Sequence, residues 1–509
     1  MLPSFLAALS DRRPRGLLLW ILVSILGSAC VEGIASPGEK QGVLLVVVDG
    51  LRADHVGAIS GPRPTTPRLD ALASEGLVFA DAIAAAPLLQ PAHIGILTGS
   101  APELARKFYR HESGEARWDI KPRIPHLAVE FLGAGYQTAA FLDRSTLAPS
   151  EGFARGFQEF LRLDDGVPSA ERITRHAQRL EDWLNSLGED QAWFAYLHLA
   201  DLERSWTDPL EPWDGYFKPP TSAGMYDVPP VGTTDASFFA LPHSRWRGRS
   251  RSLGEYVASY DGHLRRLDQE LGAIFARLRT LGLDQSTTVV VVGSYGMQFG
   301  EAGLYLSSGL YSMADLHVPW IIRPRQGQQQ AAPGTRVEQV VSLLDLAPTL
   351  LEMEGLPIPA GMHGISQAAH LKATPPSKPL RREAFASSGT IEGFALVGER
   401  YVVEMLRPAS LQNRTQRLSW NGVDSSAEAP DAIRYYDRVQ SPFPSLGPYQ
   451  HRVGQAQREF LARQRRAFDW AANVFGSRSV LQRGSLWGQP VAPERVEELM
   501  RLGYLGSGR

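Results

Sequence analysis

The stretch VLLVVVDGLRADHVG, residues 43–57, gives the strongest indication of the fold. It opens with an uninterrupted apolar run, residues 43–48, in which most side chains are β-branched. A strand that is apolar at every position is typical of a parallel sheet covered by helices on both faces. Asp49 follows at once, at the carboxyl end of the strand, where α/β sheets place their binding groups. Position alone leaves two interpretations of Asp49 open, a site residue or a residue of a turn or helix cap.

Length and composition describe an ordinary globular protein. The chain has 509 residues, of which 43% are hydrophobic and 21% charged, and this length is sufficient for a large core. The net charge of -2 gives no reason to expect nucleic acid as a partner. A basic cluster at residues 244–251 fits a solvated loop better than a binding arm.

The N-terminus has the pattern of an export signal. Three arginines precede a short apolar run, residues 17–26, and small residues then lead to Cys30, the single cysteine of the chain. The run is short for a membrane span. A cysteine after small residues resembles the bacterial lipobox, although a glycine stands where that motif prefers leucine. We expect a lipidated Cys30 and a place in the bacterial cell envelope, as a periplasmic or outer-membrane lipoprotein attached to the membrane. An ordinary signal peptide and an uncleaved anchor remain alternatives.

The remaining chain alternates strand-like and helix-like patterns, as βαβ units require. A helix is expected to begin at Pro67 with Thr66 as its N-cap, a short strand to follow at residues 77–79, and a loop to run into a helix over residues 87–99. We expect a signal over residues 1–30, a tether over 31–41, an α/β domain over 42–375 with a long loop insertion at 205–250, and a C-terminal subdomain over 376–509. That subdomain is expected to hold a small sheet near residues 399–403 and an amphipathic helix over 450–475.

Several segments together resemble the sulfatase family of the alkaline phosphatase superfamily. VVDGLRADHVG, PTTPRLDALASEG and PLLQPAHIGILTG stand in the family's order within residues 43–99. Further similar segments follow at residues 127–141, 152–157, 256–268, 281–292, 316–323, 341–357 and 498–506. The resemblance implies an α/β fold with a mostly parallel central sheet flanked by helices and a small C-terminal sheet.

The same resemblance implies where a reaction centre would lie. Ester hydrolysis in this family uses a metal ion, Ca²⁺ or Mg²⁺, held mainly by carboxylates, and a nucleophile. Asp49 corresponds to the first metal aspartate, and Gly50 stands where many members have a second one. Leu89 occupies the nucleophile position, and leucine has no atom that can attack an ester. His93 replaces an arginine of the nucleophile motif.

The second metal segment departs further from the family pattern. SYGMQFGEAG, residues 294–303, aligns with the family's D-H-G-E-x-x-G-E-H-G. Several family residues are replaced here by residues that cannot do the same chemistry. Ser294 replaces the metal aspartate, and Tyr295 and Ala302 replace histidines. Ser307 replaces a basic residue, and Glu203 replaces the histidine of a D-P-H motif. Asp49 is therefore the one aligned metal ligand of the expected type, and one carboxylate does not make a Ca²⁺ or Mg²⁺ site.

Three functions remain open at this point. The leading hypothesis is a catalytically inactive sulfatase-like envelope protein that needs no cofactor and binds a glycan, a sulfated ligand or a protein partner. The second is an active sulfuric or phosphoric ester hydrolase with a non-standard metal site that holds Ca²⁺ or Mg²⁺, drawn from Asp49, His93, Asp201 and Glu203. The third is a structural lipoprotein. Fold alone does not choose among them.

Each polar candidate also has a purely structural interpretation. Asp49 would cap a helix or bond Arg52, and His93 would be either a buried, satisfied residue or one that faces a ligand. His198 lies on an expected strand and is predicted to belong to the core rather than to a ligand set.

The other positions near Asp49 have structural interpretations too. Asp54 and His55 are expected to brace their loop. Leu89 and Tyr295 are expected to fill the space of the metal and the nucleophile, which predicts a smaller and less charged pocket than in an active member.

Overall fold

The computed structural model describes residues 40–110, 116–143, 146–164, 166–204, 210–219, 241, 243–246, 252–300, 305–309, 311–387, 393–406 and 432–438. Several sequence predictions lie outside these ranges: the signal with Cys30, the tether up to residue 39, the residue Ala302, the amphipathic helix over 450–475 and the family-like segment at 498–506. In the described ranges, no helix has both the length and the hydropathy that crossing a membrane requires.

The central element is an eight-stranded mixed sheet, in the order β12-β2-β11-β8-β1-β7-β5-β6. Its strands are β1 (Gly42–Asp49), β2 (Leu77–Ile83), β5 (Gln137–Leu142), β6 (Glu159–Arg162), β7 (Trp193–Leu199), β8 (Thr287–Tyr295), β11 (His317–Arg323) and β12 (Thr335–Ser342). β11 is antiparallel to both of its neighbours, β8 and β2, and the other pairs are parallel. The mostly parallel sheet is therefore confirmed.

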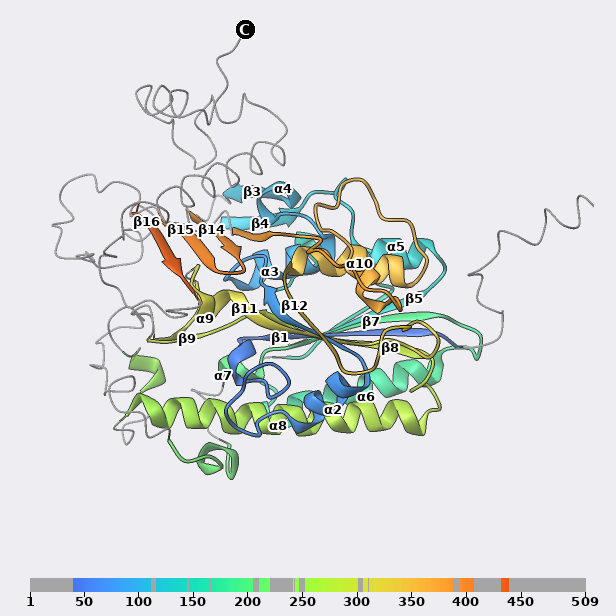
Figure 1. Cartoon of the computed structure of the whole chain (residues 1–509). Coiled ribbons are helices and arrows are strands. Elements are labelled where there is room, and N and C mark those ends of the chain that lie inside the picture. The colour runs from blue at the N-terminus through green and yellow to red at the C-terminus, as the bar shows by residue number, and fades with distance from the viewer. Residues whose placement is uncertain are drawn as a thin grey trace, which may run out of the picture. The chain divides into compact units, whose positions relative to one another are not determined.

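Helices cover both faces of this sheet (Figure 1). α3 (Leu89–Thr98), α5 (Leu127–Gly133) and α10 (Leu346–Met353) pack on one face, and α2 (Pro67–Glu75), α6 (Ser169–Ser186) and α8 (Leu253–Thr280) pack on the other. Every residue of β1 is buried, and its odd and even positions enter the two separate cores. The apolar run at residues 43–48 is continuous because both faces of its strand need apolar side chains.

The remaining elements are short. A four-stranded antiparallel sheet, β13 (Glu383–Ser387), β14 (Gly393–Gly398), β15 (Tyr401–Leu406) and β16 (Ala432–Asp437), is the small extra sheet expected in this part of the chain. Two-stranded ribbons are β3 (Arg106–Arg110) with β4 (Ala116–Ile120), and β9 (Gln298–Phe299) with β10 (Tyr305–Ser307). Short helices are α4 (Pro102–Ala105), α7 (Asp201–Arg204) and α9 (Met313–Leu316), with 3-10 turns at Ala53–His55, Pro149–Glu151, Trp213–Gly215, His243–Arg245, Leu343–Asp345 and Ala368–Leu371.

Helix α2 begins at Pro67 with Thr66 at the N-cap position, as predicted, but the Thr66 side chain makes no capping hydrogen bond. The Thr66 hydroxyl instead bonds the Asp70 carboxylate at 3.0 Å. The cap comes from α8, where Asp268 Oδ1 accepts the backbone N–H groups of Arg68 and Leu69 at 3.0 and 2.9 Å. A carboxylate at a helix N-terminus also interacts favourably with the helix dipole. The strand predicted at residues 77–79 is the first part of the longer β2.

Within the 205–250 insertion, the turn Trp213–Gly215 packs on α8. Gly262 of α8 faces the turn Trp213–Gly215, and a Cβ on Gly262 would lie 1.8 Å from the Trp213 carbonyl oxygen. Asp214 of the same turn accepts a hydrogen bond from the Ser259 hydroxyl, and His263 Nε2 lies 3.3 Å from Asp214 Oδ1. Glycine at position 262 is therefore what lets this turn approach the helix backbone.

Replacing Gly262 by alanine is expected to lower the free energy of unfolding by about 1–3 kcal/mol, because the new methyl group collides with a backbone carbonyl that cannot rotate away. The loss should coincide with faster hydrogen exchange over residues 210–219. Gly272→Ala is the matched control on the same helix, since its Cβ meets only the flexible side chain of Arg68. That variant should be neutral or more stable by up to about 1 kcal/mol. Equal effects of the two substitutions on stability would contradict this account of Gly262.

Candidate functional site

Asp49 ends β1 at the centre of the sheet, between β7 and β8. A bulge between Val48 and Asp49 brings Asp49 opposite Tyr295 of β8. Gly50 then adopts a φ of +74°, in the left-handed region that favours glycine. An aspartate at position 50, which the family often has, would be strained here. The turn therefore holds a single carboxylate at the end of the central strand.

Both carboxylate oxygens of Asp49 are engaged by other buried side chains. His93 Nε2 lies 2.9 Å from Oδ1, and His198 Nε2 lies 2.7 Å from Oδ2. The Ser294 hydroxyl donates to Oδ1 at 2.5 Å. All four residues have no exposed surface. The prediction that Asp49 caps a helix or bonds Arg52 is therefore wrong.

Three different elements bring these partners to Asp49. His93 comes from α3, His198 from β7 and Ser294 from β8. The two imidazole rings are nearly perpendicular, with centroids 4.7 Å apart. His93 Nδ1 contacts the Tyr196 hydroxyl, whereas His198 Nδ1 has no hydrogen-bond partner among the described residues. Because each Nε2 faces a carboxylate oxygen, we assign a proton to both Nε2 atoms.

The electrostatics favour an ionised Asp49. Burial by itself raises the pKa of this carboxyl, but His198 and His93 together outweigh burial and hold the pKa well below its usual range. Burial, with the nearby charge of Asp49, raises the pKa of the Tyr196 phenol well above its usual value. The centre of the site is thus a carboxylate, two imidazoles and a neutral phenol, and no water reaches any of their carboxylate or imidazole groups directly.

Of the other positions that the family uses for chemistry, Tyr295 is buried and Leu89 and Ser307 are partly buried. Leu89, at the nucleophile position, is the first residue of α3 and is partly buried against the core between the sheet and helices α3, α5 and α10. Tyr295, at a histidine position, belongs to the same core and donates to Glu203 Oε1 at 2.6 Å. Ser307 lies on β10, where its hydroxyl is 3.5 Å from the Ser308 carbonyl oxygen.

The four residues offered for a relocated site do not form one cluster by direct contact. Asp49 contacts His93, but Asp201 Oδ1 is bound by Arg266 of α8 at 2.5 Å. The carboxylate of Glu203 contacts Tyr295.

The loop after β1 has the expected internal support. Arg52 pairs with Asp54 at 2.6 Å, and His55 Nδ1 lies 2.6 Å from Asp261 Oδ1 of α8. Asp54 and His55 therefore brace their loop, as expected.

Sequence reasoning missed His198 and Tyr196 as neighbours of Asp49. Both lie on β7, two positions apart, so both side chains point to the same face of the sheet. In the parallel register, Val47 of β1 stands beside His198. The alternation of polar tips at 196 and 198 was the available signal, and the register places that pair next to the end of β1.

The donor atoms of the site fit a hard cation poorly. Ca²⁺ and Mg²⁺ take six or more ligands, almost all oxygen. The described groups that contact the Asp49 carboxylate provide two imidazole nitrogens and one hydroxyl. Asp49, His93 and His198 each offer one ligand atom within 4.8 Å of the others, as a mixed nitrogen and oxygen set. No step through Ca²⁺ or Mg²⁺ is supported by these residues.

Fold and site together define a mostly parallel α/β protein with its candidate site at the carboxyl end of the central strand. The family model described as Sulfatase matches residues 41–356, and the chain belongs to the sulfatase family.

Proteins similar to this chain include two bacterial sulfatases and a phosphonate monoester hydrolase. The chain is 24% identical to a sulfatase of Formosa agariphila over 62% of this chain and 70% of that protein. It is 23% identical to an arylsulfatase of Clostridium perfringens, over 64% and 77% of the two chains. Among solved structures, the phosphonate monoester hydrolase of Agrobacterium radiobacter has a TM-score of 0.65 at 18% identity and covers 85% of this chain and 96% of its own. At that identity the structural likeness shows the fold alone.

Proposed function

We propose that this sulfatase-family protein does not hydrolyse esters and acts by binding. The observation that carries the proposal is the state of Asp49, whose two carboxylate oxygens are both held by buried histidines. In members of the family, the aspartate that corresponds to Asp49 binds the catalytic cation, as the resemblance implies. Here the carboxylate is committed to two side chains of the chain itself.

The charge of Glu203 and the absence of a nucleophile at Leu89 also argue against ester hydrolysis. A sulfate or phosphate ester presents anionic oxygens, which a metal ion balances in this chemistry. Glu203 adds a further carboxyl group beside Tyr295, where an anionic substrate would be repelled. Leu89 offers no attacking atom. Losses of this kind cost orders of magnitude in rate even when they are made singly.

The proposed role is in the cell envelope, with a lipidated Cys30 that holds the chain at a membrane. The occupant of the binding surface would be a glycan, a sulfated ligand or a protein partner, with no nucleic acid and no Ca²⁺ or Mg²⁺ required. Two exposed aromatic residues of the 205–250 insertion, Tyr216 and Trp246, support binding over a purely structural role. Aromatic side chains on an exposed surface supply much of the contact area in recognition sites.

A second candidate is an active ester hydrolase with a non-standard metal site. The specific observation in its favour is that two histidines and one carboxylate meet at the family's cation position. Such a set can bind a metal and activate water.

Hydrolysis of an aryl sulfate and an aryl phosphate by the full-length chain, together with its Ca²⁺ and Mg²⁺ content, tests the proposal. We expect turnover no higher than that of Asp49→Asn, and no stoichiometric Ca²⁺ or Mg²⁺. Asp182→Asn, which changes an exposed carboxylate on α6, controls for the loss of one charge. Turnover that Asp49→Asn abolishes and Asp182→Asn retains would contradict the binding role and favour the hydrolase.

A further inference from the structure

We propose that Asp49, His93 and His198 form a binding site for a borderline transition-metal ion, with Zn²⁺ as the best fit. The inference goes beyond the proposed function, because it concerns what the cluster holds rather than whether esters are hydrolysed. The three residues offer two imidazole nitrogens and one carboxylate oxygen, all within 4.8 Å of one another. Two of these donors are absent from the oxygen-rich cation site that the family resemblance implies.

The type of ligand selects the class of metal. Imidazole nitrogen binds zinc and neighbouring transition metals, whereas Ca²⁺ and Mg²⁺ prefer oxygen. Zinc sites that are open to a further ligand commonly have three protein ligands, and two histidines with one carboxylate are one of the known sets. His93, His198 and Asp49 are such a set, on three elements of a rigid sheet-and-helix framework.

The distances between the ligand atoms define the adjustment that an ion would require. With metal–ligand bonds of about 2.0–2.1 Å and tetrahedral angles, neighbouring ligand atoms lie about 3.3 Å apart. The Nε2–Oδ distances are 2.9 Å for His93 and 2.7 Å for His198. Each nitrogen would move away from the carboxylate by roughly half an ångström, which side-chain torsions can absorb. The two Nε2 atoms now face different oxygens of Asp49, so they would also draw together around the ion from a separation within 4.8 Å.

The surroundings provide hydrogen bonds that orient two of the three ligands, His93 and Asp49, whereas His198 Nδ1 has no partner among the described residues. Binding replaces the Nε2 protons, so each imidazole then carries its proton on Nδ1. The Nδ1 atom of His93 already contacts the Tyr196 hydroxyl, which would accept that proton's hydrogen bond. The Ser294 hydroxyl donates to the carboxylate of Asp49 and would hold its orientation. Outer hydrogen bonds of this kind fix the tautomer and ring angle of a ligating histidine.

Burial determines how the ion would arrive. Asp49, His93 and His198 have no exposed surface, so we expect the ion to enter while the chain folds rather than by diffusion into the finished protein. Metal must therefore be present during expression or refolding.

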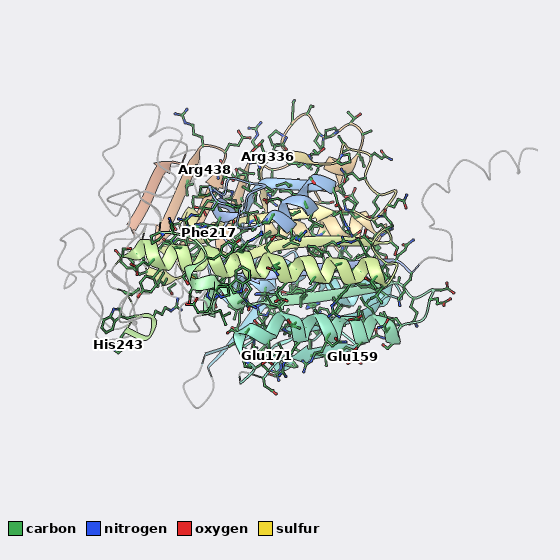
Figure 2. All side chains as sticks on the ribbon, turned by 90° about the horizontal axis from the view of Figure 1, so that it is seen from below. Glu159, Glu171, Phe217, His243, Arg336 and Arg438 are labelled. Carbon is green, nitrogen blue, oxygen red and sulfur yellow. The ribbon has the colours of Figure 1, made fainter. Side chains whose placement is uncertain are left out.

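The test is the zinc content of the full-length chain, refolded with Zn²⁺ and then dialysed, by elemental analysis. We expect one zinc ion per chain in the unchanged protein. His93→Ala and His198→Ala should each bind Zn²⁺ at least about 100-fold more weakly, because even an outer-shell partner contributes about 10–100-fold. His243→Ala is the matched control, because His243 is exposed and lies away from the sheet (Figure 2). No zinc in the unchanged protein, or full zinc in both cluster variants, would overturn the inference.

A second variant keeps the test decisive if the alanine variants do not fold. Tyr196→Phe leaves all three ligands in place and removes only the group that orients His93, so affinity for Zn²⁺ should fall by about 10–100-fold. Visible absorption of the Co²⁺-substituted protein should shift in the same variant. Unchanged affinity and an unchanged Co²⁺ spectrum would count against the site.

The outcomes separate this inference from the proposed function. Zinc at the cluster without ester turnover supports both. Absence of zinc overturns the metal site and leaves the binding role standing. Zinc-dependent turnover that His198→Ala abolishes supports the metal site and overturns the inactive assignment.

Discussion

Asp49→Ala is expected to lower the free energy of unfolding by about 3–5 kcal/mol, the largest effect of any single substitution near the site. The change removes the acceptor of two buried imidazoles and of the Ser294 hydroxyl. Three polar groups without exposed surface would then lose a partner at once. A buried donor left without an acceptor costs about 1–3 kcal/mol.

Urea unfolding in the presence of a chelator measures this effect without any contribution from bound metal. Asp182→Asn, on the exposed side of α6, should change stability by less than about 0.5 kcal/mol. A loss below about 1 kcal/mol for Asp49→Ala would show that the cluster contributes little to the fold.

Acid unfolding gives an independent readout of the same carboxylate. The pKa of Asp49 is lowered in the folded state from an ordinary value of 3.8, so its ionised form stabilises the fold above that value. This contribution is lost as the pH falls through and below about 4. Asp49→Asn has no carboxyl to protonate, and its stability should therefore fall less steeply over that pH range than that of the unchanged protein.

Arg172→Leu is expected to cost a similar amount, about 3–5 kcal/mol, because it leaves a buried charge without its partner. Arg172 and Asp143 both have no exposed surface, and their side chains form an ion pair. Arg172 also donates to the carbonyl oxygens of Asp143, Asp164 and Val167, at 2.7, 3.0 and 3.0 Å. Asp143 Oδ2 in turn accepts the backbone N–H of Ala200 at 3.0 Å, two residues after His198. The pair therefore also supports the end of β7 that carries the site.

Two controls isolate the buried charge. Arg175→Leu breaks an exposed ion pair with Glu171 on the same helix, and it should cost less than about 1 kcal/mol. The double variant Asp143→Leu with Arg172→Leu should recover part of the loss, because no charge then remains buried. If Arg175→Leu and Arg172→Leu had equal effects, burial would not explain the role of Arg172.

The sheet was predictable because its signals are local. Residues 43–48 are apolar at every position, and that pattern alone indicates a strand covered on both faces. The start of α2 at Pro67 was predictable for the same reason, from the fixed φ of proline. The cap of α2 was not, because Asp268 reaches it from another helix 200 residues further along the chain.

The site was only partly predictable. Asp49 and His93 were found by their place in the motif pattern, but their contact joins residues 44 positions apart. His198 lies 149 positions from Asp49, on a strand whose seven residues are all buried. In such a strand both faces are covered, so the polar residues at 196 and 198 indicate a shared face but not which face of the sheet it is. The tertiary register that sets β7 beside β1 supplies what sequence pattern lacks.

The central position of β1 has a consequence for how the molecule assembles. Its neighbours β7 and β8 begin at Trp193 and Thr287, so more than half of the 509 residues must be synthesised before both edges of β1 are paired. Contacts between such distant segments slow folding, because a long loop must close before the contact forms. During that interval the apolar strand β1 presents open edges to any other extended segment. A chaperone that shields residues 43–48 would therefore act on the earliest vulnerable step of this protein's biogenesis.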